Sequence, residues 1–298
     1  MALFALGDPH LSFGRADKPR SLRSKAWQGH EEKLRKNWLA AVTEADTVVL
    51  LGDVSFGRTE EECRPDFDFL RSLPGRKILL RGNHDMYWDA KKTARLNEKY
   101  AGELFFLQDN FYEYASGGET WALTGTKGYC FENLDAPEHY EKIRDREAER
   151  LRTSLRAARE AGRRRFIVFL HYPPTSSLWP PTPELCRALG MSRTQEREIR
   201  RQERELLLRR GGDSDGHNLV LDLKKLSGEA KKRAGEVTEL TRSPFTDLAE
   251  EYGAEMVLYA HVHGRERFSD SLHGAVRGVG YQLTSGDYLD FKPFKVLD

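Results

Sequence analysis

The stretch KILLRGNHDMYW, residues 77–88, joins an apolar run to three adjacent polar side chains, Asn83, His84 and Asp85. The apolar run is typical of a buried β-strand, and Gly82 interrupts it just before the polar residues. A buried strand that ends in polar side chains delivers them to one edge of its sheet. In open α/β sheets, ligands bind beyond this edge. The stretch therefore predicts a site at the end of the strand, with partners from elsewhere in the chain.

Short apolar runs alternate with segments of helical spacing, which is the pattern of an α/β protein with a largely covered sheet. Strands are predicted at residues 2–6, 46–51, 76–81, 103–107, 120–126, 163–174 and, as closing strands, within 278–291. Helices are predicted at residues 30–42, 65–73 and 137–161, and a helix followed by a strand at 243–264. The early strands stop at Gly-Asp or Gly-Asn pairs, so polar residues recur where strands end.

We expect a single domain over residues 1–298 that carries a charged, partly helical insertion at about 180–242. The insertion has few aromatic residues, and its apolar positions are too sparse for a well-buried helix face. Its basic stretch, residues 193–210, is interleaved with glutamates. This pattern favours a solvated helix with i to i+4 pairs over a nucleic-acid surface. A lid and an oligomer contact stay open as alternatives.

The overall composition restricts the class of partner and the compartment. A formal net charge of +1 over 298 residues provides no global field for nucleic acid or for an anionic membrane. The cysteines, Cys63, Cys130 and Cys186, are isolated and odd in number, which favours reduced thiols over a disulfide framework. The N-terminal apolar run is too short for a signal peptide or a membrane span. We therefore expect a soluble, cytoplasmic protein without a membrane partner.

Five strand ends carry polar residues from which a metal site can be built. These residues are Asp8, His10, Asp53, Asn83, His84, Asp85, His171, His261 and His263. Carboxylates and imidazoles without thiolates suit borderline divalent ions such as Mn, Fe, Co, Ni or Zn. All of them except His84 and Asp85 are candidate ligands, too many for one ion with an open position and suitable for two. Two ions about 3.5 to 4 Å apart stabilise the attacking and the leaving oxygen of a phosphoryl displacement.

The remaining polar residues near the opening motif acquire roles from their positions. His84 follows Asn83 directly, where it would protonate the leaving alkoxide or stabilise charge on the phosphoryl oxygens. Asp85 would hold the His84 ring through a hydrogen bond. Arg81 precedes the motif and would contact a phosphate bidentately. An arginine that merely caps the strand end is an equally good interpretation of Arg81.

The order Asp-x-His, Gly-Asp, Gly-Asn-His-Asp, a single His after a strand and a final His-x-His resembles the calcineurin-like metallophosphoesterase superfamily. The resemblance spans Asp8 to His263. More narrowly, LPGRKILLRGNHD, LHYPP and GDYLDFKP are similar to a group of bacterial phosphohydrolases without an assigned substrate. The resemblance implies a four-layer αββα sandwich, in which two mixed sheets pack together between outer helices.

The resemblance also implies the division of the candidate ligands. It assigns Asp8, His10 and His263 to one metal and Asn83, His171 and His261 to the other, with Asp53 between the two metals and His84 as the catalytic histidine. The chain departs from the family pattern at Ala260, where the family usually has Gly before His-x-His. It also departs in the long insertion between His171 and His261.

The leading hypothesis is a dinuclear metal-dependent phosphoesterase, in which a metal-bound hydroxide attacks phosphorus in line and His84 assists departure of the alcohol. A small-molecule phosphate ester is the favoured substrate. One alternative is a phosphodiesterase that acts on cyclic nucleotides or nucleic acid. Another is a non-catalytic metal-binding scaffold, which is disfavoured because no expected ligand is missing. The sequence leaves the native metals and the oligomeric state open.

Overall fold

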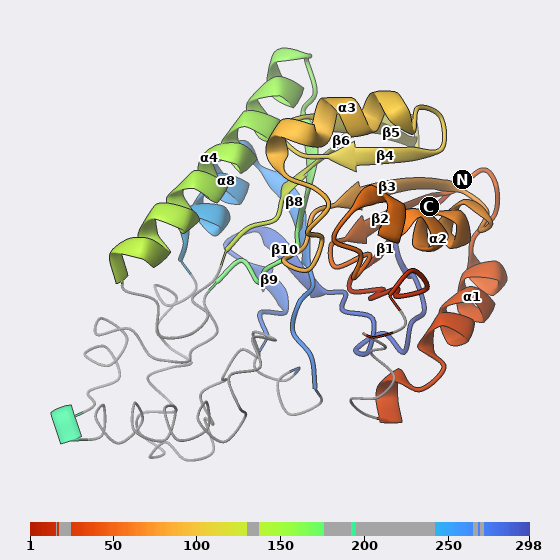
Figure 1. The fold of residues 1–298 in the computed structure, drawn as a ribbon. Coiled ribbons are helices and arrows are strands. Elements are labelled where there is room, and N and C mark those ends of the chain that lie inside the picture. The colour runs from red at the N-terminus through yellow and green to blue at the C-terminus, as the bar shows by residue number, and fades with distance from the viewer. Residues whose placement is uncertain are drawn as a thin grey trace.

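The structure is a computed structural model that describes residues 1–15, 17, 25–129, 137–175, 192–194, 242–264, 268 and 271–298. Two β-sheets lie at its centre, with helices on their outer sides (Figure 1). Of the expected insertion, only residues 192–194 and 242 are among the described residues. The predictions for that segment, and for Cys130 and Cys186, lie outside the described part of the chain.

The first sheet has five strands in the order β11-β1-β2-β3-β4. The strands are β1 (Leu3–Leu6), β2 (Thr47–Leu51), β3 (Arg76–Leu80), β4 (Leu104–Leu107) and β11 (Phe294–Leu297). β1 to β4 are parallel, whereas β11 pairs with β1 in antiparallel orientation. The sheet is therefore mixed, and the carboxyl ends of its four parallel strands share one edge.

The second sheet has six strands in the order β5-β6-β7-β8-β10-β9. The strands are β5 (Phe111–Ser116), β6 (Glu119–Thr126), β7 (Arg165–Leu170), β8 (Ala254–Tyr259), β9 (Gly274–Val276) and β10 (Val279–Leu283). The four inner strands are parallel, and the edge strands β5 and β9 are antiparallel to their neighbours. The second sheet is therefore mixed as well.

Alternate residues of each strand enter different cores, which shows the layering. In β1, Leu3 belongs to the core between the two sheets, whereas Phe4 belongs to the core beneath the outer helices. In β7, Ile167 and Phe169 face the space between the sheets, and Val168 packs on the opposite side. Such alternation is expected of sheets that are covered on both faces. The molecule is thus a four-layer αββα sandwich, as predicted.

The outer helices divide between the two sheets. The first sheet is covered by η2 (Lys25–Trp27), α1 (His30–Ala41), α2 (Glu60–Arg71) and α3 (Thr93–Lys99), and the short η3 (Ala90–Lys92) directly precedes α3. The second sheet is covered by α4 (Pro137–Glu160) and α8 (Pro244–Tyr252). α8 is capped at its start by Ser243, whose side chain accepts hydrogen bonds from Phe245 N and Thr246 N, both at 3.2 Å. It ends at Gly253, which adopts the left-handed conformation.

The structure differs from the predicted elements at several places. α2 begins at Glu60 rather than at residue 65, because Thr59 caps it by accepting a hydrogen bond from Glu62 N at 3.3 Å, and Pro65 lies inside the helix. Within the predicted closing strands, only Val279–Leu283 forms a named strand. The residues after it turn, and the chain re-enters the first sheet as β11, which begins directly after Pro293. The sequence analysis did not predict β11.

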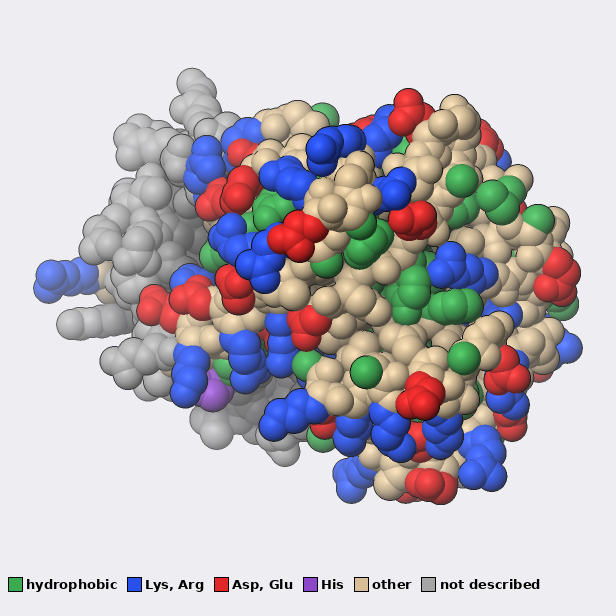
Figure 2. Space-filling model, turned by 90° about the horizontal axis from the view of Figure 1, so that it is seen from above, with side chains coloured by type: hydrophobic (Ala, Val, Ile, Leu, Met, Phe, Trp, Pro, Cys, Tyr) green, Lys and Arg blue, Asp and Glu red, His purple; other side chains and the backbone are tan. Residues whose placement is uncertain are grey.

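The exterior is polar and mixed in charge. On the face shown in Figure 2, Lys and Arg side chains are interspersed with Asp and Glu rather than gathered in one patch. α4, 24 residues long, carries many charges, and none of the helices in the described residues is apolar and long enough to cross a bilayer. Cys63 is a free, buried thiol.

Candidate metal centre

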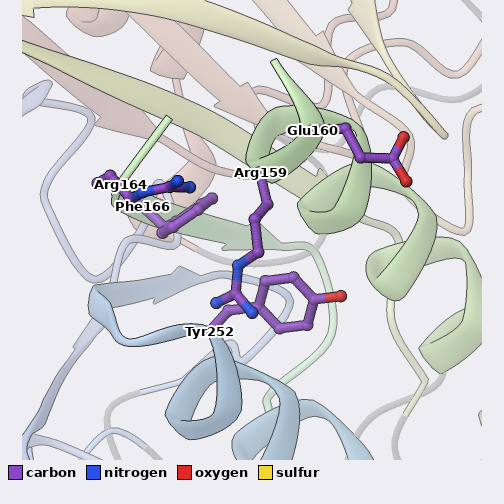
Figure 3. Close-up of a pocket in the computed structure, with 5 residues that line it drawn as sticks. All are labelled: Arg159, Glu160, Arg164, Phe166 and Tyr252. Carbon is purple, nitrogen blue, oxygen red and sulfur yellow. The ribbon is translucent and has the colours of Figure 1, made fainter. Parts of the chain in front are cut away.

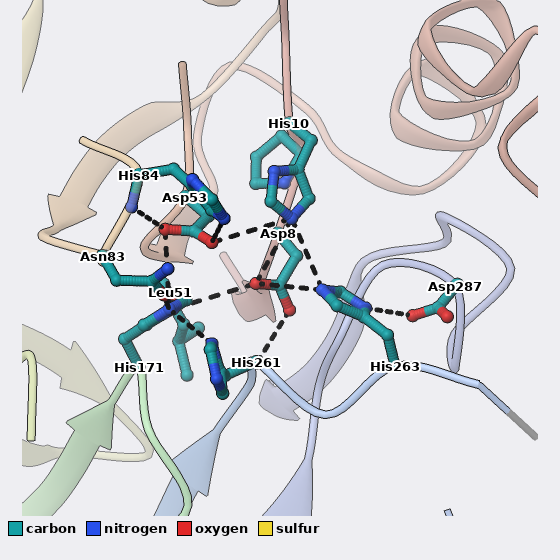
Figure 4. A network of polar contacts seen from close by, with 12 residues as sticks. Asp8, His10, Leu51, Asp53, Asn83, His84, His171, His261, His263 and Asp287 are labelled. Atoms are coloured by element: carbon teal, nitrogen blue, oxygen red, sulfur yellow. Dashed lines mark hydrogen bonds and ion pairs between the residues drawn. The ribbon is translucent and has the colours of Figure 1, made fainter. Parts of the chain in front are cut away.

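The carboxyl ends of parallel strands from both sheets meet at one place, where most of the predicted site residues lie (Figure 4). Backbone contacts join the sheets there, since Gly7 N donates to Thr284 O at 2.7 Å. His171 Nδ1 also lies 2.8 Å from Leu51 O. The predicted residues that converge at this edge are Asp8, His10, Asp53, Asn83, His84, His171, His261 and His263.

Four of the converging residues have an unusual backbone. Asp8, His10, Asp53 and His261 adopt φ angles of 55°, 46°, 50° and 71°, in the left-handed region that side chains other than Gly rarely enter. Such conformations cost on the order of 1 to 3 kcal/mol each and cluster at functional sites. Each of these residues follows a strand directly or within four residues. The backbone is therefore turned sharply just where the polar side chains begin.

Glycines allow the loops to approach one another closely. A Cβ at Gly82 would overlap the amide and the carboxylate of Asp53, so only Gly fits between β3 and the loop after β2. A Cβ at Gly7 would overlap the Cβ of Ala260. The missing side chain at Gly7 therefore makes room for Ala260, the residue that departs from the expected family pattern.

The first group of candidate ligands comprises Asp8, His10 and His263. The Nε2 atoms of His10 and His263 are 3.4 Å apart. Asp8 Oδ1 lies 4.0 Å from His10 Nε2 and 3.8 Å from His263 Nε2. The other oxygen, Asp8 Oδ2, accepts a hydrogen bond from His261 N at 2.9 Å, which fixes the orientation of the carboxylate.

The second group comprises Asp53, His171 and His261, with Asn83 beside them. His171 Nε2 lies 2.8 Å from Asn83 Oδ1, 3.1 Å from His261 Nδ1 and 3.5 Å from Asp53 Oδ1. The second oxygen, Asp53 Oδ2, lies 3.7 Å from His10 Nε2 of the first group. Asp53 therefore faces both groups.

Burial controls the charge of these groups. It raises the pKa of Asp8 to about 6 and lowers the pKa of His171 to about 3. Burial would also raise the pKa of Asp53, but the nearby imidazoles, His171 and His84 foremost, hold it well below its ordinary value. The His171 ring is thus neutral and the Asp53 carboxylate ionised at pH 7, which are the protonation states of metal ligands.

The geometry fits metal ions. No described residue donates a hydrogen bond to Asp8 Oδ1, although the atom is buried. An unsatisfied buried carboxylate oxygen is costly unless an ion completes it. Two donors that each lie about 2.1 Å from one ion at a tetrahedral angle are roughly 3.4 Å apart. Separations of 3.4 to 4.0 Å within the first group agree with this spacing.

His84 lies at the opening of the site. Its side chain is 23% exposed, whereas those of Asp8, Asp53 and His171 are at most 1% exposed. The His84 amide donates to Asp53 Oδ1 at 2.8 Å, and His84 Nε2 lies 3.9 Å from Asp53 Oδ2. The ring is therefore anchored beside the candidate ligands while it remains accessible from solvent.

Asp85 was predicted to hold the His84 ring, and the contacts that the structure shows for it are with backbone amides. Both of its oxygens accept hydrogen bonds from backbone amides, Oδ1 from Val54 at 2.9 Å and Ser55 at 3.2 Å, and Oδ2 from Gly82 at 2.7 Å. The side chain is fully buried, and these three amide contacts use both of its oxygens. Asp85 instead fixes the loop after β2 against the loop after β3.

Asp287 was missed by the sequence interpretation. Its Oδ1 lies 2.8 Å from His263 Nδ1, and its Oδ2 accepts a hydrogen bond from Gly264 N at 3.1 Å. It follows the isolated bridge between Gly7 and Ser285 rather than a regular strand. The only signal was its place in the GDYLDFKP stretch that carried the narrower family resemblance.

Arg81 and Lys127 follow strands that end at the edge where the site lies. Arg81 follows β3, and no described residue accepts a hydrogen bond from its buried Nε. Lys127 follows β6, and its carbonyl oxygen accepts hydrogen bonds from the amides of His171 at 3.1 Å and Tyr172 at 2.9 Å. The Lys127 ammonium lies 5.3 Å from the centre of the Tyr172 ring, which is itself 4.3 Å from the His261 ring.

Comparisons with known proteins agree with this geometry. The family model described as calcineurin-like phosphoesterase matches residues 1–265. The Gene 66 protein of Mycobacterium phage D29 is 35% identical over 95 residues, which are 30% of this chain and 45% of that protein. The Gene 66 protein of Mycobacterium phage L5 is 36% identical over 78 residues, 26% of this chain and 37% of that protein. The chain thus matches less than half the length of these curated relatives.

Solved structures align with the chain only distantly. A protein of unknown function from Aquifex aeolicus aligns with a TM-score of 0.43 and 14% identity, over 99% of this chain and 95% of that one. A 5'-nucleotidase precursor from Thermus thermophilus aligns with a TM-score of 0.30 and 13% identity, over 58% of this chain and 37% of that one.

Proposed function

The chain belongs to the calcineurin-like phosphoesterase family, and we propose that it hydrolyses phosphate esters with two divalent metal ions. The observation that carries the proposal is the position of Asp53, whose Oδ1 lies 3.5 Å from His171 Nε2 and whose Oδ2 lies 3.7 Å from His10 Nε2. One carboxylate that faces both groups of ligands suits a pair of ions held close together. When bound, the two ions would polarise the phosphoryl oxygens and lower the pKa of a water molecule.

The proposed ligands follow the two groups of side chains. Asp8, His10 and His263 would hold one ion, Asn83, His171 and His261 would hold the other, and Asp53 would contact both. These oxygen and nitrogen donors suit Mn, Fe, Zn, Co or Ni. Among the ligands only Asp8 and Asp53 are anionic, so a doubly loaded site would attract an anionic phosphate group.

The residues of the chain itself would bind the phosphate and move the proton. His84, exposed beside Asp53, would donate a proton from its ring to the oxygen of the departing alcohol. Arg81 would donate hydrogen bonds to the phosphoryl oxygens, which would supply the acceptor that its buried Nε lacks among the described residues. Asp85 would keep the His84 and Asp53 loops in place through its three amide contacts.

The favoured substrate is a small-molecule phosphate ester. A phosphodiester, such as a cyclic nucleotide or nucleic acid, is the second candidate, and the pair of imidazoles His10 and His84, with ring centres 5.5 Å apart, is compatible with it. The scaffold alternative is disfavoured, since every expected ligand is present and eight predicted residues converge.

The test is turnover of aryl phosphates by protein loaded with Mn²⁺. We expect release of nitrophenol from p-nitrophenyl phosphate, loss of turnover after removal of metal by EDTA, and slower release from bis(p-nitrophenyl) phosphate. Faster release from the diester would favour the second candidate. Metal binding without turnover of either ester would favour the scaffold. Protein that binds no metal and cleaves neither ester would overturn the proposal.

A further inference from the structure

Two candidate ligands, His263 and His171, are held in the same way but by different partners. Each ring contacts its partner through Nδ1 at 2.8 Å and turns Nε2 toward the other ligands (Figure 4). The partner of His171 is the backbone carbonyl of Leu51, which is neutral. The partner of His263 is the carboxylate of Asp287. The two groups of ligands thus differ in the charge that stands behind a histidine.

Asp287 is firmly built into this position. Its side chain is 5% exposed, and its second oxygen accepts a hydrogen bond from Gly264 N at 3.1 Å. The preceding segment is tied to the β1 loop, because Gly7 N donates to Thr284 O at 2.7 Å and Gly7 bridges to Ser285. One carboxylate therefore fixes both the ring of His263 and the backbone that follows it.

The contact with Asp287 has a chemical consequence for His263. A carboxylate that accepts the Nδ1 proton keeps the ring in the tautomer whose Nε2 lone pair is available to a metal. It also makes that nitrogen more basic than a neutral carbonyl does. Besides Asp287 behind His263, this group of ligands contains the carboxylate of Asp8. Asn83, His171 and His261 are neutral ligands, and the candidate ligand with a carboxylate in their group is Asp53.

We propose that Asp287 makes the two metal sites unequal, so that the site of Asp8, His10 and His263 binds its ion more tightly and fills first. The second site, with Asn83, His171 and His261, then holds the more readily exchanged ion. Asp287 acts here as a positioning residue, because it contacts a ligand rather than the metal. The inference rests on the proposed two-metal site, but it can fail while that proposal stands.

The test uses Mn²⁺ alone, without substrate. Protein is dialysed to equilibrium against a series of buffered free Mn²⁺ concentrations, and bound metal is measured by elemental mass spectrometry. For the wild-type protein we expect a tight and a weaker class of site, one ion each. His261→Ala is expected to remove the weaker class and to leave the tight class, which assigns the two classes to the two groups of ligands.

Asp287→Asn is the decisive variant. We expect the dissociation constant of the tight class to rise by about 10- to 100-fold, the usual effect of removing an outer hydrogen-bond partner of a ligand. The weaker class should remain, which also shows that the variant is folded. Asp290→Asn is the matched control, since Asp290 lies three residues further along and its side chain is 80% exposed. The control should bind Mn²⁺ as the wild type does.

An unchanged tight class in Asp287→Asn, or a selective loss of the weaker class, would overturn the inference. If Asp287→Asn loses both classes, Asp287→Glu decides, because it restores a carboxylate: recovery of the tight class supports the inference, and its absence contradicts it. A wild-type protein that binds no Mn²⁺ would instead overturn the proposed function together with the inference. Two wild-type classes that Asp287→Asn leaves untouched would overturn the inference alone.

Discussion

Strand β7 shows the contrast between the two ends of the molecule. It begins at Arg165, which is 35% exposed, binds Glu255 through two nitrogens at 2.6 and 2.8 Å and covers the ring of Trp121 at 4.0 Å. It ends beside His171, which is fully buried next to other titratable groups. At the first end the charge of Arg165 is paired with a carboxylate at the surface. At the second end the fold buries polar groups, among them Asp8 Oδ1, to which no described residue donates a hydrogen bond.

The hollow at the first end strengthens the contrast. It is lined by Arg159, Glu160, Arg164, Phe166 and Tyr252 (Figure 3). The Arg159 guanidinium lies 3.9 Å from the centre of the Tyr252 ring, a stacking arrangement that already uses its charge. A charged hollow alone therefore does not identify a functional site. Buried, strained and incompletely satisfied groups are the better indication, and they gather at the carboxyl ends of the strands.

The largest expected effect comes from His84. Replacement by Ala should lower kcat by about 10²- to 10⁴-fold, since general acid catalysis usually contributes that much. Metal content should stay as in the wild type, because His84 lies outside the proposed ligands. Steady-state kinetics on p-nitrophenyl phosphate and elemental analysis measure the two quantities. His139→Ala, at an exposed position of α4, is the control. A parallel loss of metal in His84→Ala would make His84 a ligand instead.

The second effect concerns stability at the site end. Burial raises the pKa of Asp66 to about 6 from an ordinary value of 3.8. Its oxygens accept hydrogen bonds from Phe13 N at 2.8 Å and from the Ser55 hydroxyl, so it ties together the loops that carry His10 and Asp53. The Asp66 carboxyl group therefore keeps its proton to a higher pH in the folded protein than in the unfolded chain. The free energy of unfolding of the protein therefore falls as the pH rises through the interval between these two values.

Asp66→Asn should remove this fall in the free energy of unfolding with rising pH, because the Asn side chain stays neutral. Relative to the wild type, the free energy of unfolding of the variant should rise by about 2 kcal/mol more at pH 7.5 than at pH 4. Urea denaturation in the presence of EDTA at the two pH values measures the change without a contribution from metal. A difference between variant and wild type that is the same at both pH values would show that Asp66 does not titrate in this range.

The third effect concerns Arg81. Arg81→Ala should lower kcat/KM by about 10-fold or more, since a charge-assisted hydrogen bond to phosphate contributes on the order of 1.5 kcal/mol. Arg81→Lys keeps the charge but loses the bidentate geometry, and should recover only part of the activity. Metal content and the free energy of unfolding should not change. Full activity of Arg81→Ala would favour the purely structural interpretation of this residue.

The smallest effect belongs to the opposite end of β7. Arg165→Ala should cost less than about 1 kcal/mol of the free energy of unfolding, because exposed ion pairs contribute little. A double-mutant cycle with Glu255→Ala isolates the contribution of the pair. Metal binding and turnover should equal those of the wild type. Loss of either in Arg165→Ala would break the contrast between the two ends.

The sequence predicted the parts of the fold that depend on local pattern. The apolar runs around residues 46–51 and 76–81 became strands, and the polar residues after them converged as expected. The four layers came from the family resemblance rather than from periodicity. β11 was missed because Pro293 and the short apolar run after it resemble a tail, and its pairing with β1 at the other end of the chain leaves no local signal.

Side-chain direction was the other limit. His84 and Asp85 are neighbours in the sequence, but the former points to the opening of the site and the latter into the interior. Adjacency therefore did not reveal that Asp85 contacts three backbone amides. Asp287 was missed because its contact with His263 spans 24 residues and depends on how the segment after β10 turns. Spacing reveals which residues reach an edge of a sheet, but not how each carboxylate is turned there.

The central claim is that this edge holds a pair of metal ions that share Asp53. The most direct test is the metal content of the full chain purified without chelators, measured by elemental mass spectrometry beside Asp53→Asn. The proposed two-metal site predicts close to two transition-metal ions per wild-type chain and a clear fall in the variant. One ion or none in the wild type, even after reconstitution with excess Mn²⁺, would contradict it.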